Sequence, residues 1–254
     1  IMISFQIANN SPLYEQALKA KSALEKAIAS FKSDLDIVVK VSDEVQLEFE
    51  SKTLGSNFQI DFTKDKLAWR LAHGGKNSEP VCKAVIGKLT NPIVFDATAG
   101  LGRESLILQS GKAQVYMFER NPIIWLMLNS ALYKAQNNQE FLDQLKNGLP
   151  KLMPLGTIKD QYPRANLPIP DVIYYDPMFP QRTKSALVKK DMRVFHELIG
   201  ADTDVLEYAN FLCTIAKHHV VVKRPANEDP LELNKRRSSF IDGKACRFDC
   251  YYTS

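Results

Sequence analysis

The stretch Ile93–Glu104, which reads IVFDATAGLGRE, decides the fold of this chain. Its first three residues form a continuous apolar run, which is typical of a strand in a parallel sheet covered on both faces. Two glycines, Gly100 and Gly102, then precede a helix that we expect to begin at Glu104. Such glycines let the backbone turn tightly and approach a ligand closely. Ser105 stands where a third glycine would complete the dinucleotide-binding pattern, so a tight turn without a ligand remains an alternative for this stretch alone.

Strands and helices alternate from about residue 80 onward. Further strands are expected at Gln114–Phe118, Lys151–Leu155, Asp171–Tyr175 and His219–Lys223. Helices are expected at Val81–Leu89, Pro122–Lys134 and Val205–Ala216. Arg247–Tyr252 could close the sheet as an antiparallel edge strand. This alternation is typical of an α/β fold with a doubly wound, mostly parallel sheet.

The N-terminal part has a different pattern and is expected to form a small α+β unit over residues 1–75, with the second domain over 76–254. A helix should begin at Ser11-Pro12, because serine is a good N-cap and proline fits the first helical position, and run to about Phe31. Short strands are expected at Leu35–Val41, Val45–Phe49 and Phe58–Phe62. The turn-rich segment Ala72–Ser78 separates the two parts.

The composition is that of a globular protein, since 45% of the 254 residues are apolar and 24% are charged. Lysine and arginine number 33 against 29 aspartate and glutamate residues, which gives a net charge of +4. Any binding of nucleic acid must therefore come from clustered charge and not from the total.

Membrane, secreted and metal-binding classes are disfavoured. The longest apolar run, Ile123–Leu128, is far shorter than the ~20 residues that span a bilayer, and no secretory signal pattern opens the chain. The four cysteines lack CxxC spacing, and the histidines show no metal-ligand spacing. We therefore expect a cytoplasmic protein with reduced thiols, bound neither to a membrane nor to a metal.

An acidic residue follows the second strand of the predicted sheet. Glu119 comes 17 residues after Gly102, at the edge of the sheet where α/β proteins bind ligands. A carboxylate there can accept hydrogen bonds from both ribose hydroxyls of a nucleoside. Taken alone, an acidic residue at this position is more often a solvated strand end. Together with the glycine turn it favours a cofactor that contains adenosine. The P-loop pattern GxxxxGK[ST] is absent from the sequence, which argues against a P-loop nucleotidase.

The loop Asp176–Pro180, DPMFP, follows the next clear strand and is stiffened by two prolines. Methylation of an exocyclic amine needs such a loop, because the nitrogen lone pair is delocalised into the base and the base must be held in a fixed plane. Asp176 and a loop carbonyl can accept the amine N–H groups, and Phe179 can stack on the base. A plain structural turn is the alternative.

A basic run continues from this loop, with five cationic residues within twelve positions against one acid: Arg182, Lys184, Lys189, Lys190 and Arg193. Lys223 and Arg224 follow the next strand, and Lys235–Arg237 add charge on the same rim. A basic run usually marks a solvated helix face. Its place beside the proposed base pocket instead favours contact with RNA phosphates.

These motifs resemble those of the class I S-adenosylmethionine-dependent methyltransferases. The stretches that carry the resemblance, over roughly residues 67–254, are DATAGLGRE, ERNP, DPMFP, SALVKKDMRVF and VVVKRP. More narrowly, they are similar to the J-type bacterial methyltransferases of small-subunit ribosomal RNA, which modify guanine N2. The third position of the DPMFP loop is Met178 and not proline, a feature that the J-type family shares.

The resemblance implies a seven-stranded Rossmann-like sheet, S-adenosyl-L-methionine as cofactor, and 16S ribosomal RNA or the small ribosomal subunit as partner. It also implies a set of cofactor contacts around the strand ends: Asp96, Gly100, Gly102, Arg103, Glu104, Glu119, Arg120, Gly156, Thr157 and Asp176. Asp176 and Phe179 would be the catalytic residues.

Three other functions remain open at this point. Another nucleic-acid amino-methyltransferase, such as one acting on adenine N6 in DNA, would use the same loop. A non-catalytic RNA-binding or ribosome-assembly protein could keep the fold, although Glu119 and Asp176 speak against it. A nicotinamide dehydrogenase is disfavoured by the missing third glycine and by the DPMFP loop.

Overall fold

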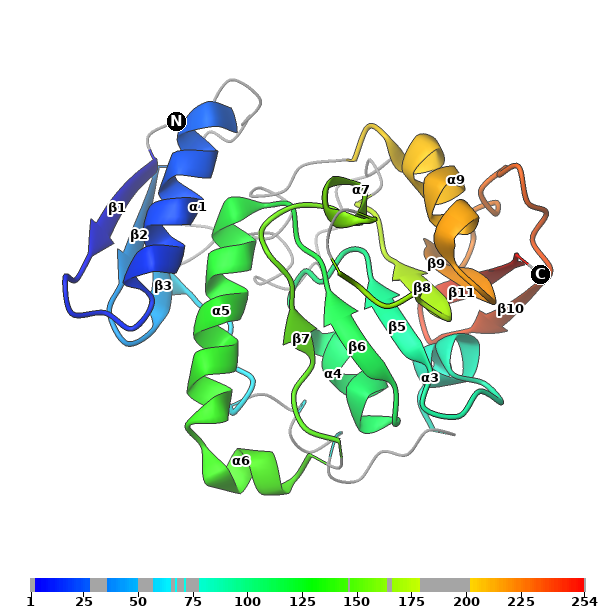
Figure 1. Cartoon of the computed structure of the whole chain (residues 1–254), viewed down its shortest axis with the longest axis horizontal. Coiled ribbons are helices and arrows are strands. Elements are labelled where there is room, and N and C mark those ends of the chain that lie inside the picture. The colour runs from blue at the N-terminus through cyan, green and yellow to red at the C-terminus, as the bar shows by residue number, and fades with distance from the viewer. Residues whose placement is uncertain are drawn as a thin grey trace. The chain divides into compact units, whose positions relative to one another are not determined.

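The computed structural model describes residues 3–27, 36–49, 57–64, 67, 71, 78–145, 147–163, 166–178 and 202–253. The chain divides into two compact units (Figure 1). The first contains Ile1–Asp61, Asn121–Asn137 and Met178–Asp202, and the second contains Phe62–Arg120, Asn138–Pro177 and Thr203–Ser254. The expected domain boundary at residue 75 stays a prediction.

The second unit is built on a seven-stranded sheet in the order β10-β11-β9-β8-β5-β6-β7. Its strands are β5 (Ile93–Asp96), β6 (Gln114–Met117), β7 (Lys151–Leu152), β8 (Val172–Tyr175), β9 (His219–Pro225), β10 (Ser239–Asp242) and β11 (Cys246–Tyr252). β5 through β9 pair in parallel, and β11 pairs antiparallel with both β9 and β10. The predicted doubly wound, mostly parallel sheet is therefore confirmed.

One sequence-based expectation about this sheet is wrong. The strand expected at Arg247–Tyr252 is not the edge of the sheet, because β11 lies between β9 and β10. β10 takes the edge position, and the sequence analysis missed it. Three of its four residues are exposed, so it has no buried apolar face that would produce a periodic pattern.

The strand order places a ligand site at the ends of β5 and β8. From β5 the chain moves outward to β6 and β7, and it then returns to β8 on the other side of β5. Ligands of such sheets bind beyond the carboxyl ends of the strands, where the order reverses. The candidate ligand-binding residues are therefore those that follow β5, β6, β7 and β8.

Helices cover both faces of this sheet. Val220 and Val222 of β9 share one core with Tyr208 and Leu212 of α9 (Val205–Ile215). His219 lies on the opposite face, where its Nε2 is 2.9 Å from the carbonyl oxygen of Ala84 on α3 (Pro80–Val85). The unit also contains α4 (Arg103–Ser110), α6 (Gln139–Asp143) and α7 (Ile158–Gln161).

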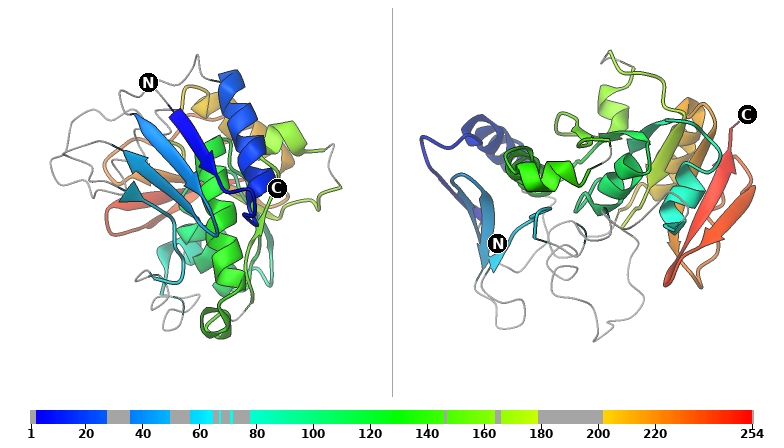
Figure 2. Two further views of the ribbon diagram at one scale, coloured as in Figure 1. Left: turned by 90° about the vertical axis from the view of Figure 1, so that its left-hand side faces the viewer. Right: turned by 90° about the horizontal axis from the view of Figure 1, so that it is seen from below.

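The first unit contains a four-stranded sheet in the order β1-β2-β3-β4, with α1 (Tyr14–Ala27) alongside it (Figure 2). Its strands are β1 (Ile3–Ile7), β2 (Ile37–Val41), β3 (Val45–Phe49) and β4 (Asn57–Phe58). β1, which was not expected, pairs in parallel with β2, and the other pairs are antiparallel. The strand expected at Phe58–Phe62 is shorter than predicted.

The first unit also includes α5 (Pro122–Gln136), which packs against α1 and β3. The backbone N–H of Val45 donates to Oγ of Ser130 at 2.7 Å. Lys134 Nζ lies 3.0 Å from Glu44 and 2.7 Å from Asp61. The small unit is therefore held together by a helix that lies far along the chain from its strands.

None of the described helices combines the length and apolar character that a membrane crossing requires. Among the same residues, no three His, Cys, Asp or Glu side chains are grouped so that they could hold a metal ion.

Candidate active site

The glycine turn joins β5 to α4 through backbone conformations that suit glycine. Gly100 and Gly102 have φ angles of 54° and 72°, which strain any residue with a Cβ atom. Gly102 is the N-cap of α4, and its N–H donates to the carbonyl oxygen of Ala99 at 2.7 Å. The tight turn predicted from the two glycines is present and lies at the point where strand order reverses.

Asp96, the last residue of β5, anchors this turn from within. Its side chain is 1% exposed, and its carboxylate accepts the hydroxyl of Ser105 at 2.6 Å and the N–H of Thr98 at 3.1 Å. Burial raises its pKa to about 7, with smaller contributions from the carboxylates of Glu104 and Asp176. Ser105 therefore has a structural task at the position where a third glycine would stand.

Thr98 is a site residue that the sequence analysis did not identify. Its Oγ1 accepts the N–H of Asp176 at 2.7 Å, while its own N–H is bound to Asp96. Thr98 thus links the end of β5 to the loop after β8. A short hydroxyl side chain two residues beyond a strand end was the available signal, since such residues often hydrogen-bond to nearby backbone.

Glu119 brings the ends of three strands together. Its side chain is 6% exposed, and Oε2 accepts the N–H of Gly100 at 3.0 Å. Its backbone carbonyl accepts the N–H of Gly156 at 3.0 Å. The expectation that Glu119 lies beside the glycine turn agrees with this geometry.

The turn after β7 contains Gly156 and Thr157. Gly156 has a φ of 136°, and a Cβ atom there would lie 3.1 Å from Oδ2 of Asp160. Thr157 caps α7 through a capping box with Asp160. Arg120, the residue after Glu119, makes an ion pair on this side of the sheet. Its Nη1 lies 3.2 Å from both carboxylate oxygens of Asp204, at the start of α9.

A lysine bridges two carboxylates at the ends of β8 and α4. Nζ of Lys223 lies 2.8 Å from Oδ2 of Asp176 and 3.2 Å from Oε1 of Glu104. Partial burial raises the pKa of Asp176, Lys223 opposes this increase, and Glu104 adds to it. Burial also disfavours the Lys223 ammonium, but the two carboxylates outweigh it and raise its pKa.

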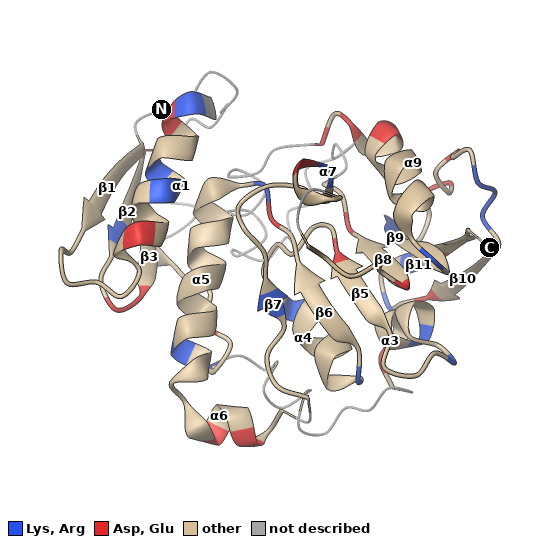
Figure 3. Cartoon of the chain, in the orientation of Figure 1, with Lys and Arg blue, Asp and Glu red and all other residues tan. Residues whose placement is uncertain are grey.

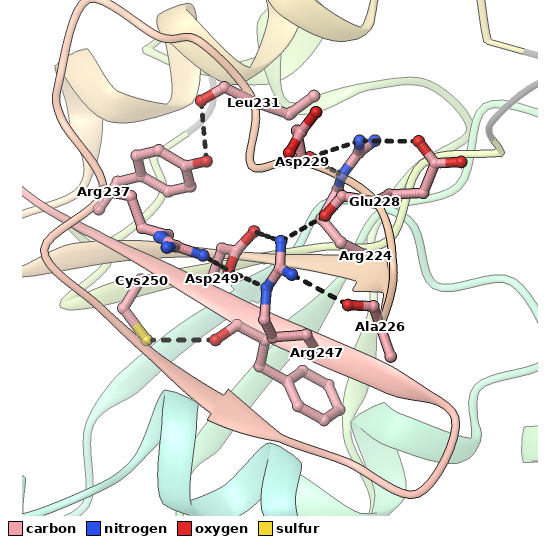
Figure 4. Close-up of polar contacts among 11 residues, drawn as sticks. Arg224, Ala226, Glu228, Asp229, Leu231, Arg237, Arg247, Asp249 and Cys250 are labelled. Atoms are coloured by element: carbon pink, nitrogen blue, oxygen red, sulfur yellow. Dashed lines mark hydrogen bonds and ion pairs between the residues drawn. The ribbon is translucent and has the colours of Figure 1, made fainter.

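The two basic residues expected after this strand, Lys223 and Arg224, lie within β9 near its end and are turned toward protein groups. Lys223 is in the bridge just described, and Arg224 is 8% exposed. The Arg224 guanidinium donates to the carbonyl oxygen of Asp229 at 3.0 and 2.6 Å and lies 3.6 Å from Glu228 (Figure 4). Their contact with phosphate stays a prediction, and so does the cofactor role of Arg103, the first residue of α4.

The remaining predicted site residues lie outside the described part of the chain. These are Phe179, Arg182, Lys184, Lys189, Lys190 and Arg193. The described residues on either side of this segment, Met178 and Asp202, are hydrogen-bonded to each other. The Met178 N–H donates to Oδ2 of Asp202, and the Asp202 N–H donates to the Met178 carbonyl oxygen, each at 2.8 Å.

A family model of SAM-dependent methyltransferases matches residues 19–253 of this chain. The chain is 41% identical over 197 residues to ribosomal RNA small subunit methyltransferase J of Thioalkalivibrio sulfidiphilus, a match that covers 77% of this chain and 76% of the relative. The chain belongs to the SAM-dependent methyltransferase family. The protein of the same name from Haemophilus influenzae is 38% identical over 236 residues and covers 92% of this chain and 90% of its own.

A solved structure agrees with this assignment. The crystal structure of a SAM-dependent methyltransferase from Neisseria gonorrhoeae superposes with a TM-score of 0.68 at 27% sequence identity. The match covers 99% of this chain and 96% of that chain. The similarity therefore extends over both compact units of this methyltransferase.

The residues of the methyltransferase fit S-adenosylmethionine as the cofactor. The glycine turn lacks Cβ atoms at its two left-handed positions, which allows a close approach of ligand. The buried Glu119 carboxylate lies against this turn and suits ribose hydroxyls. Four acidic residues, Asp96, Glu104, Glu119 and Asp176, lie at or next to these strand ends, which suits a ligand with a positively charged sulfonium and ammonium.

Proposed function

We propose that this methyltransferase transfers a methyl group from S-adenosylmethionine to the exocyclic N2 of a guanosine in 16S ribosomal RNA. The relatives at about 40% identity are named ribosomal RNA small subunit methyltransferase J, which supports this RNA as the substrate. The observation that carries the proposal is the placement of Asp176. Its carboxylate follows β8, and its N–H is bound to Thr98 beyond β5, where strand order reverses.

Asp176 would orient the substrate nitrogen. The bound cofactor supplies an electrophilic methyl group on a sulfonium sulfur. The Asp176 carboxylate would accept an N–H of the guanine amine, and this hydrogen bond strengthens as the nitrogen loses its conjugation and gains positive charge. Met178 is held by two hydrogen bonds to Asp202, and the next residue in the sequence, Phe179, would stack on the base.

The cofactor would be held by the residues around the strand ends. Glu119 would accept the ribose hydroxyls, and the turn around Gly100 and Gly102 would lie against the ligand. Arg103, Glu104, Arg120, Gly156, Thr157 and Asp96 would complete the surroundings. We place the reaction in the cytoplasm, in agreement with four cysteines that are all free thiols.

A methylation assay tests this function. Purified protein and radiolabelled S-adenosylmethionine are incubated with 16S ribosomal RNA from a strain that lacks the corresponding gene, with assembled small subunits, and with duplex DNA. We expect transfer to ribosomal RNA, and N2-methylguanosine by mass spectrometry of the digested product. N6-methyladenine as the product would contradict the guanine assignment. Tight cofactor binding without transfer to any substrate would favour an assembly protein.

A further inference from the structure

The edge strand β10 carries an exposed aromatic residue. Phe240 is 47% exposed, on a strand that forms the end of the seven-stranded sheet. Exposed apolar side chains on an edge strand promote aggregation, and proteins usually avoid them there. Phe240 pairs with Asp249 of β11, and the neighbouring Cys250 faces Ala84 of α3 on the other side of the sheet. Phe240 therefore points away from α3.

Two guanidinium groups lie against the Phe240 ring. Cζ of Arg237 is 4.9 Å from the ring centroid, and Cζ of Arg247 is 6.0 Å from it. Both arginines converge on the carboxylate of Asp249, which is 0% exposed (Figure 4). Arg237 lies 3.0 Å from Oδ1, and Arg247 holds Oδ1 at 2.7 Å and Oδ2 at 3.0 Å.

This anchoring fixes the two arginines before any ligand binds. Arg247 also donates to the carbonyl oxygens of Ala226 at 3.1 Å and Glu228 at 2.8 Å. A guanidinium held in place loses less side-chain entropy when it meets a further planar or anionic group. The aromatic ring and the arginines thus form a preorganised surface.

The charge of the surrounding segment is positive. From Lys235 to Lys244 there are four lysines and arginines against one acid, Asp242, and the basic run leads directly into β10 (Figure 3). Lys235, Arg236 and Lys244 are exposed. Because β9 and β10 both pair antiparallel with β11, β10 ends at the same edge of the sheet as β9. The turn with Lys244 therefore lies at the edge where Asp176 follows β8.

We propose that these residues form a binding surface for single-stranded RNA next to the target guanosine. The surface, here termed the β10 surface, consists of Arg236, Arg237, Phe240, Lys244 and Arg247. Lys235, expected on the same rim, instead donates from Nζ to the carbonyl oxygen of Thr253 at the opposite edge of the sheet. A base stacks on Phe240, which Arg237 and Arg247 support, and the exposed side chains of Arg236 and Lys244 contact phosphates, as in proteins that bind unpaired RNA. This inference rests on RNA as the substrate.

Binding measurements on variants and one control test the β10 surface. Anisotropy of a labelled single-stranded fragment of 16S ribosomal RNA is followed over a series of salt concentrations. We expect Phe240→Ala to weaken binding about tenfold, because one stacked base is lost. R236Q/K244Q should reduce the slope of log K against log salt by about 0.7 for each lost phosphate contact. The matched control K112Q/K151Q replaces two exposed lysines beside β6 and β7 and should change neither quantity.

A tryptophan variant keeps the test independent of protein stability. Phe240→Trp retains an aromatic ring, so it should bind RNA as the wild type does, and the fluorescence of the introduced indole should be quenched on binding. Unchanged RNA affinity in Phe240→Ala, together with no added quenching in Phe240→Trp relative to the wild type, would overturn the β10 surface. Methylation of ribosomal RNA by the wild type is measured separately. Its absence would refute the proposed function, whereas its presence with unaffected variants would refute this surface alone.

Discussion

At the scale of single residues, Lys223 supplies a positive charge to the carboxylates of the candidate site. Its ammonium lies within 3.2 Å of both Asp176 and Glu104, and it separates two carboxylates that would otherwise repel each other. Asp96, Tyr174 and Cys246 also interact electrostatically with the Asp176 and Glu104 carboxylates. The lysine was expected to contact phosphate, and its position suggests that it keeps Asp176 ionised.

The variant Lys223→Gln distinguishes these two roles. Loss of the positive charge should raise the pKa of Asp176, because the ionised carboxylate loses its stabilising partner. The acidic limb of the kcat–pH profile should therefore move to higher pH, and Lys223→Arg should restore it. The salt dependence of RNA binding should stay unchanged. A smaller salt slope with an unaltered pH profile would instead identify Lys223 as a phosphate contact.

Asp176 should matter for chemistry more than for binding. Asp176→Asn keeps the shape of the side chain but removes the charge that stabilises the developing positive charge on nitrogen. We expect kcat to fall by roughly 100-fold, by analogy with the loss of one preorganised polar group, while RNA affinity changes little. Single-turnover methylation at saturating cofactor measures this. A wild-type rate in the variant would rule out the assignment of this loop.

Glu119 should matter for cofactor binding. Loss of a charge-assisted hydrogen bond weakens an interaction by ~1.5–3 kcal/mol, or roughly tenfold to a hundredfold in affinity. Titration calorimetry of Glu119→Ala should therefore show weaker binding of S-adenosylmethionine. Glu232→Ala, which removes an exposed glutamate before β10, is the control and should bind as the wild type does. Equal affinities for both variants would exclude Glu119 from the site.

Among the elements, those with strong local patterns were predictable from the sequence. The apolar runs of β5, β8 and β9 and the glycine turn before α4 lie where the sequence indicated. β10 was missed because three of its four residues are exposed and it has no apolar periodicity. β1 does alternate apolar and polar residues, ISFQI, and the sequence analysis overlooked this strand pattern. The hydrogen bonds of Thr98 and Ser105 were not predictable, since their partners depend on how β5, β8 and α4 come together. The packing of α5 against α1 is likewise a tertiary contact with no local signal.

The start of α5 gives an element-scale prediction. Oδ1 of Asn121 accepts the N–H groups of Ile123 at 3.0 Å and Ile124 at 3.1 Å, and Pro122 occupies the first helical position. Asn121→Ala removes this cap and should reduce the free energy of unfolding by about 1 kcal/mol. Asn121→Asp retains a capping oxygen and should lose much less. Urea denaturation compares the two, and equal losses would show that the cap is not the cause.

For the whole molecule, two buried groups in the second unit give stability opposite dependences on pH. Burial is the main reason that the pKa of His219 falls from 6.5 to about 4. Between these values the unfolded chain binds a proton that the folded protein excludes, so His219 makes stability decrease as pH falls. Burial raises the pKa of Asp96 from 3.8 to about 7. There the folded protein holds a proton that the unfolded chain releases, so Asp96 makes stability decrease as pH rises.

Substitution of each group should reveal its own contribution to this pH dependence. Because one pKa unit corresponds to 1.36 kcal/mol, each group changes the free energy of unfolding by at most about 1.4 kcal/mol per pH unit. Between pH 4 and 6.5 the two slopes oppose each other in the wild type. In that range, the stability of His219→Gln relative to wild type should decrease with rising pH, and that of Asp96→Asn should increase. Urea denaturation at several pH values measures both differences, and if both changed with pH in the same direction, the opposite pKa shifts of these two buried groups would be contradicted.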